Sequence, residues 1–161
     1  MRVWIASLAA VLIQPLVYAV RIAPAYFASP TPLYGAGPAF VSIVIAAAAV
    51  VLVLGVPTFF LLRRLRLAGV VSLAISGFVL GAMTAAVPGW PRYLEGFSAG
   101  ENWHGRFVNT YVNGVPTKYA WLTYAESVFY FGVHGFVGAL TFYLVWRLFE
   151  VRANMARAEA A

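Results

Sequence analysis

The chain of 161 residues contains no cysteine and no aspartate, and it has only five acidic residues and two histidines. The absence of cysteine excludes disulfides, thiol chemistry and cysteine-ligated metals. A metal site needs three or four ligands at defined spacing, which two histidines without aspartate do not supply. Haem bound between membrane helices needs paired histidines, and His104 lies outside the apolar segments. We therefore expect no metal and no cofactor.

Charge is also scarce, at 10% of the residues, while 63% are hydrophobic. Soluble chains carry about 25% charged residues, so a water-soluble domain is excluded. The net charge of +6 does not indicate a nucleic-acid partner, because no basic patch is interleaved with polar residues. The basic residues instead flank apolar segments, which is typical of membrane proteins.

Four apolar segments follow one another, at about 3–20, 40–62, 67–87 and 125–146. Each has close to the roughly 20 residues that a helix needs to cross the hydrocarbon core. Because lipid leaves no backbone group without a partner, these segments are expected to be helices, and unbroken apolar runs do not fit a membrane barrel. The sequence predicts an all-α integral membrane protein, with residues 1–161 forming one domain of four transmembrane helices.

The first segment has an alternative interpretation. Residues 1–19 have a basic start, an apolar middle and small residues near Ala19, as a cleaved signal peptide does. Its apolar run is long for such a peptide, so we expect the span to be retained.

Basic residues predict the orientation. Seven of the eleven lie next to span ends on one side of the predicted bundle: Arg2, Arg63, Arg64, Arg66, Arg147, Arg152 and Arg157. By the positive-inside rule, both termini and the "RRLR" turn are expected in the cytoplasm. A lipid-headgroup site is the alternative explanation of the arginine clusters.

Two segments are then expected outside. Residues 21–38 hold four prolines and two glycines, which argues against a regular helix or central strand. Residues 88–124 form the larger loop. Within it, 107–112 and 115–121 flank Asn113-Gly114, a dipeptide that predicts a β-hairpin because both turn positions need positive φ.

The segments "NGVPTKYAWLTY" and "FGVHGFVGALTFYLVWR" carry a resemblance to a known group. The last third of the chain resembles small four-span inner-membrane proteins of Gram-negative bacteria. The shared pattern is Gly-x-Pro-Thr before an aromatic motif, then glycines at every third residue and an arginine. The resemblance implies a location in a bacterial inner membrane; the group has no assigned activity that could be carried over.

The last span presents two special faces on a helical wheel. With Glu126 at zero, Tyr130, His134 and Thr141 lie within about 80°, and we call these four residues the polar stripe. The nearly opposite direction holds three glycines suited to close helix packing: Gly132, Gly135 and Gly138. Gly77 and Gly81 in "GFVLG" form a second packing motif, which implies a partner helix.

The stripe admits a structural and a functional hypothesis. A charge within the membrane costs at least about 2.5 kcal/mol, so such groups are candidates for a proton relay or a ligand site. Alternatively, a neutral His134 bonds to a neighbouring helix, for example to Ser72, Ser76 or Thr84. Glu126 lies at the outer end of the span and could anchor the outer loop through Arg106 or Lys118.

The outer loop holds a further candidate set in "ENWHGR", with Glu101, His104 and Arg106 within six residues. An acid, a base and a cation this close could act on a lipid headgroup. Short polar loop segments usually hold no such site, so we expect no catalytic residue here.

These observations favour a non-enzymatic membrane protein that works by protein–protein binding, as an accessory subunit or an inner-membrane immunity or protective protein. Its expected partners are membrane lipid and a membrane protein or further copies of itself. The alternative hypothesis is a lipid- or ion-handling transporter, or a lipid-headgroup enzyme.

Overall fold

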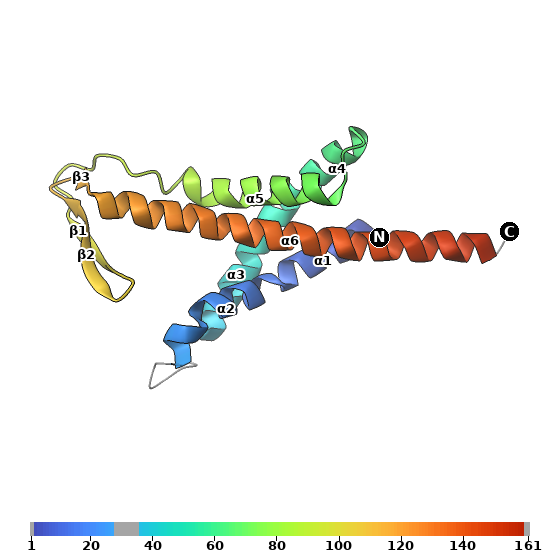
Figure 1. The fold of residues 1–161 in the computed structure, drawn as a ribbon, viewed down its shortest axis with the longest axis horizontal. Coiled ribbons are helices and arrows are strands. Elements are labelled where there is room, and N and C mark those ends of the chain that lie inside the picture. The colour runs from blue at the N-terminus through green and yellow to red at the C-terminus, as the bar shows by residue number, and fades with distance from the viewer. Residues whose placement is uncertain (1, 28–35, 160–161) are drawn as a thin grey trace.

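A computed structural model describes residues 2–27 and 36–159 (Figure 1). The fold is mostly helical. Three helices are long and apolar enough to cross a membrane, and they comprise Arg2–Ala23, Gly37–Arg64 and Lys118–Ala153, while Val70–Ala86 is a shorter apolar helix. These helices indicate a multi-pass membrane protein.

The first long helix bends at Ile13, between α1 (Arg2–Leu12) and α2 (Gln14–Phe27). Pro15 explains the bend, because its ring has no N–H and displaces the carbonyl four residues earlier. α2 continues to Phe27 and the next helix begins at Ala36, so the prediction that residues 21–38 are not helical is wrong for 21–27 and for 36–38. A proline inside a helix removes one backbone hydrogen bond, but the neighbouring residues keep theirs, so the helix can continue through it. The prediction for 28–35 lies outside the described residues.

The second long helix comprises α3 (Ala36–Val50), a π-helical turn η1 (Val51–Gly55) and α4 (Val56–Arg64). It begins four residues before the predicted span. The π-turn ends two residues before Pro57, whose missing N–H disturbs the regular ladder at this point. The helix ends at Arg64, and the chain turns away at Arg66, which has a φ of 61°, while the amide of Leu67 donates to the carbonyl of Leu62 at 2.8 Å. This is the Schellman arrangement that closes a helix.

The last two helices, α5 (Val70–Ala86) and α6 (Lys118–Glu159), run side by side in opposite directions (Figure 1). α6 is longer than the predicted span of 125–146 at both ends. Its first turn is capped by Thr117, whose hydroxyl accepts from the amide of Tyr119 at 3.2 Å. Beyond the apolar part, Arg147 binds Glu150 at 2.8 Å, one turn away.

A three-stranded antiparallel sheet precedes α6, in the order β1 (Ala99–Trp103), β2 (Arg106–Val112) and β3 (Val115–Pro116). The predicted hairpin at Asn113-Gly114 is confirmed, and both residues have positive φ, at 48° and 83°. The predicted strand 115–121 is wrong beyond Pro116, because Thr117 starts the helix. A second turn at His104-Gly105, with φ values of 49° and 81°, joins β1 to β2 and was not predicted.

Glycines bring the backbones of α5 and α6 into direct contact. A Cβ added to Gly77 would lie 2.5 Å from the carbonyl oxygen of Gly135, and one added to Gly81 would lie 3.0 Å from the Gly135 Cα. Gly132 receives the ring of Phe78. Gly138 instead accommodates the side chain of Gln14 from the first helix. The glycines of α6 therefore serve two neighbouring helices.

The buried core lies where α1, α4, α5 and α6 meet. Phe59 is 2% exposed and packs edge-on against Phe142 and Trp146, at centroid distances of 4.8 and 5.2 Å. Ala6 and Ala10 of α1 and Leu73 of α5 complete this cluster. Small residues on α1 let the aromatic side chains of α6 fill the space between the helices.

Replacing Gly135 with alanine should lower the unfolding free energy by about 1–3 kcal/mol, because the new methyl group would overlap the Gly77 carbonyl. The measurement is an SDS titration of the protein in mixed micelles. Gly37→Ala on α3 is the matched control, since nothing lies within 4 Å of an added Cβ there. Equal stability of the two variants would show that the two backbones do not touch.

Candidate functional site

The Glu126 end of the polar stripe holds the sheet against α6. The Glu126 carboxylate accepts a hydrogen bond from the indole N–H of Trp103 at 2.9 Å, and the His104 Nε2 lies 3.3 Å from the same carboxylate. A hydrogen bond to an ionised group contributes about 1.5–3 kcal/mol, whereas an exposed ion pair contributes about 0–1 kcal/mol. The Trp103 bond is therefore the main polar attachment of the sheet. The predicted anchors Arg106 and Lys118 are wrong, because the turn at His104-Gly105 presents Trp103 and His104 instead.

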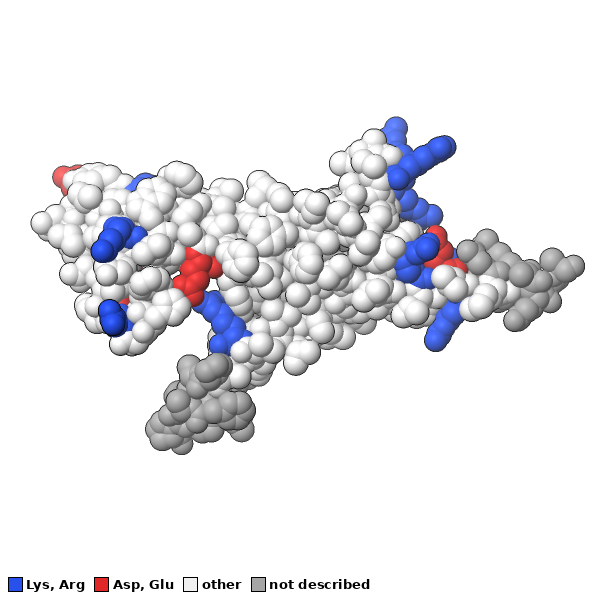
Figure 2. Space-filling model, viewed as in Figure 1, with Lys and Arg blue, Asp and Glu red and all other residues white. Residues whose placement is uncertain are grey.

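Arg21 of α2 joins this end of the stripe. Its guanidinium lies 4.0 Å from the Glu126 carboxylate, and it also stacks over the ring of Tyr130 at 4.0 Å from the centroid. Figure 2 shows a basic group beside an acidic one, at the border of a wide uncharged belt. A cation over a tyrosine face is attracted by the ring quadrupole. Arg21 thus links α2 to α6.

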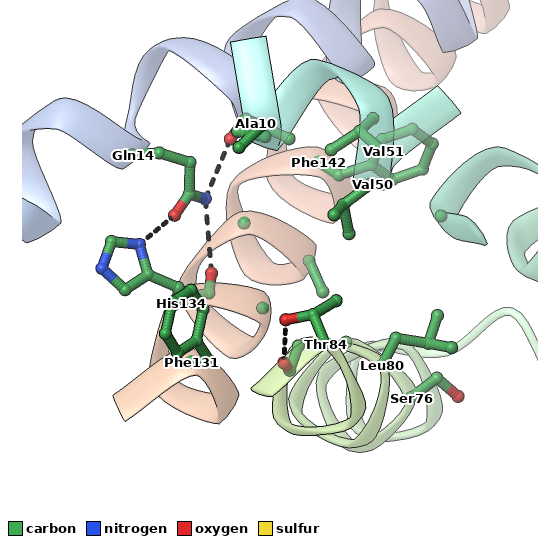
Figure 3. Close-up of a pocket in the computed structure, with 18 of the residues that line it drawn as sticks. Ala10, Gln14, Val50, Val51, Ser76, Leu80, Thr84, Phe131, His134 and Phe142 are labelled. Atoms are coloured by element: carbon green, nitrogen blue, oxygen red, sulfur yellow. Dashed lines mark hydrogen bonds between the residues drawn. The ribbon is translucent and has the colours of Figure 1, made fainter. Parts of the chain in front are cut away.

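The middle of the stripe binds the first helix. His134 Nδ1 lies 2.6 Å from the Gln14 side-chain oxygen, and the Gln14 amide nitrogen donates to the carbonyls of Ala10 and His134, at 3.0 and 3.3 Å (Figure 3). The proposed partners Ser72, Ser76 and Thr84 are wrong. Thr84 donates within its own helix, to the carbonyl of Gly81 at 2.6 Å. The bend at Ile13 turns Gln14 towards α6, and Gly138 leaves room for it.

These contacts determine which tautomer the neutral His134 side chain adopts. The Gln14 amide nitrogen faces two carbonyl oxygens, so the side-chain oxygen is the atom left to meet the imidazole. An amide oxygen only accepts, and the imidazole must therefore donate from Nδ1. Neutral His134 then carries its proton on Nδ1 and keeps Nε2 as an acceptor. The Tyr130 ring lies edge-on to the imidazole, with centroids 4.5 Å apart.

A cavity of about 430 Å³ opens between the helices beside this stripe. Its polar lining includes Gln14, Arg21, Tyr130 and His134, and the remaining lining is mostly apolar side chains from α3 to α6. The Tyr130 hydroxyl is buried and has no hydrogen-bond partner among the described residues. The size falls within the range of about 300–1,000 Å³ that is usual for ligand pockets.

The other predicted candidates are not brought together. Thr141 is half-buried, about 10 Å further along α6 than His134, and makes none of the contacts above among the described residues. In the sheet, Glu101 pairs with Val108 and Arg106 with Trp103, and both side chains are exposed. His104 faces Glu126 rather than Glu101. Within residues 2–27 and 36–159, no three histidines or acids lie close enough to hold a metal ion.

Three residues of the site were missed by sequence reasoning, namely Gln14, Arg21 and Trp103. A signal for Gln14 was present, because it is the one amide side chain in the first apolar segment and stands directly before Pro15. His104-Gly105 could also have been recognised as a turn, since histidine is enriched among non-glycine residues with positive φ.

Comparison of the chain with protein-family models, with curated proteins and with solved structures finds no match. The geometry of the site therefore carries the functional argument by itself.

The Gln14–His134 contact can be measured with a double-mutant cycle of Gln14→Leu and His134→Phe. Each single variant leaves a buried polar group unpaired, while the double variant removes both partners, so we expect a coupling of about 0.6–1.7 kcal/mol in the unfolding free energy. Thr84→Val replaces Gln14→Leu in the control cycle and should give no coupling with His134→Phe, because Thr84 bonds within α5. Zero coupling in the first cycle would contradict the assigned contact.

Proposed function

We propose that this chain is a four-span protein of a bacterial inner membrane, with both termini in the cytoplasm, that works by binding another protein. The role is that of an accessory subunit or of an immunity or protective protein. α5 serves as the third span, because it has 17 residues and lies along α6. With the apolar residues at either end it reaches about 30 Å, the thickness of the hydrocarbon core.

The distribution of charge supports the orientation. Arg63 and Arg64 end α4, and Arg66 follows them. This end of α4 lies on the same side of the molecule as the C-terminal part of α6, which holds Arg147 and Arg152 (Figure 1). Figure 2 shows an uncharged belt between the basic groups at this end and the end that holds the sheet. By the positive-inside rule, the end of the bundle with more basic residues marks the cytoplasmic side. The sheet then lies on the opposite, outer side.

The attachment of the sheet through Glu126 is the observation that carries the binding function. Glu126 and His134 of the stripe are both used to join elements, Glu126 to the sheet and His134 to Gln14 of α2. The sheet is thereby held at the outer end of the bundle as a fixed surface. Its exposed side chains include Phe107, 76% exposed, and Val115, and Tyr93 of the preceding loop is also exposed. Aromatic residues held on a rigid support are typical anchors of protein interfaces.

The lipid-handling alternative is favoured by one observation, the cavity between the helices. That cavity is separate from the sheet surface, so the two functions do not exclude each other.

The orientation can be tested with reporter fusions at Ala161, after Arg64 and at Gly96. The first two should report the cytoplasm and the third the opposite side, because the basic clusters retain their ends of the bundle inside. Alkaline phosphatase and green fluorescent protein fusions provide complementary readouts. Phosphatase activity at Ala161 would overturn the proposed topology.

Binding by the sheet can be tested with a photo-crosslinking amino acid at Phe107, in cells of the native host. We expect crosslinking to give a discrete protein adduct. At matched abundance of this chain, the adduct should be lost in the Glu126→Ala variant, because this variant releases the sheet. The control is the same crosslinker at Phe60 of α4, which is also aromatic and 50% exposed but lies far from the sheet (Figure 1). Phe107 adducts with lipid alone would contradict the proposal.

A further inference from the structure

The cavity between the helices has one polar end and one apolar end. Along α6 its lining runs from Tyr130 to Phe142, a distance of about 18 Å at 1.5 Å per residue. Tyr130 and His134 stand at one end with Arg21 and Gln14 nearby. Phe142 and Phe59 close the other end as part of the buried aromatic cluster. The cavity is therefore long and amphipathic.

The local backbone keeps this space open. On α3 and η1 the lining includes Ala46, Ala47 and Gly55, and on α5 and α6 it includes the glycines of the helix contact. α3 packs mainly on α1 and α2, so it does not fill the space beside α5 and α6. The π-turn lies in the wall of the cavity, and such turns inside helices are frequent at functional sites.

The volume suits one alkyl chain. An engineered cavity of about 150 Å³ binds benzene, so a space roughly three times as large holds on the order of fifteen to twenty carbon atoms.

The polar end favours an anionic headgroup. Arg21 is the only lysine, arginine or acid among the described residues that line the cavity. Glu126 is outside the lining and already accepts from Trp103 at 2.9 Å, whereas Arg21 is 4.0 Å from it. The guanidinium carries five donors, and its plane matches carboxylate or phosphate oxygens.

We infer that this cavity binds a single long-chain anionic amphiphile, with the chain lying between α3 and the α5–α6 pair and the carboxylate or phosphate headgroup at Arg21. This site is independent of the binding surface on the sheet.

The test uses a photoactivatable diazirine analogue of palmitate, with the full-length protein in phosphatidylcholine nanodiscs at mildly alkaline pH. Labelled peptides should come from the cavity walls on α3, α5 and α6. Excess palmitate and hexadecyl phosphate should both compete, since they share the anionic headgroup. Methyl palmitate should compete about tenfold less well, because it loses the charge-assisted bonds to Arg21. Inorganic phosphate should not compete, since it has no chain.

Two pairs of variants separate binding from folding. Ala47→Phe fills the cavity and should abolish labelling of its walls, while Ala49→Phe on the exposed side of α3 should leave it unchanged. Arg21→Gln should weaken labelling about tenfold, and Arg21→Lys should retain most of it, since the charge is kept. Each variant is compared at equal recovery from size-exclusion chromatography.

Labelling spread evenly over all lipid-facing helices, or unchanged in Ala47→Phe, would overturn the inference of a chain site. Equal competition by palmitate and its methyl ester would overturn the assignment of an anionic headgroup at Arg21. Neither result bears on the crosslinking experiment at Phe107.

Discussion

The direct contact of α5 and α6 at Gly77, Gly81 and Gly135 is the constraint on which the remaining structure depends. Within a bilayer, lipid is as apolar as the helix surfaces, so helices associate through close packing and hydrogen bonds. Glycine allows the two backbones to approach until carbonyl and Cα groups touch. That contact orients α6, and the orientation of α6 decides where each side chain of its polar stripe points.

The polar side chains of α6 then bind α6 to the sheet and to the first helix. Glu126 receives Trp103 and His104 from the sheet, and His134 receives Gln14 from the bend of the first helix. A neutral imidazole that donates to Gln14 avoids most of the cost of an ionisable group in the membrane. The scarce polar residues are thus explained by assembly of the fold.

The same arrangement leaves the cavity. Small residues on α5 and α6 leave space beside that pair, and α3 does not fill this space because it packs on α1 and α2. The π-turn before Pro57 lies in this wall, where a regular helix would follow a different path. Arg21 stands at the polar end because α2 continues past the predicted end of the first span. Close packing on one side and an open space on the other therefore arise from the same glycines.

The sequence by itself determined the apolar segments, the separation of basic residues and the turn at Asn113-Gly114, because hydrophobicity and positive φ are local properties. It also indicated that Glu126 and His134 needed partners. Only the tertiary structure decided which partners they have, since Gln14 is 120 positions from His134. That pairing depends on the bend at Pro15 and the space at Gly138 together. The cavity likewise has no local signature, because its walls come from segments throughout the chain that meet only after the helices have packed.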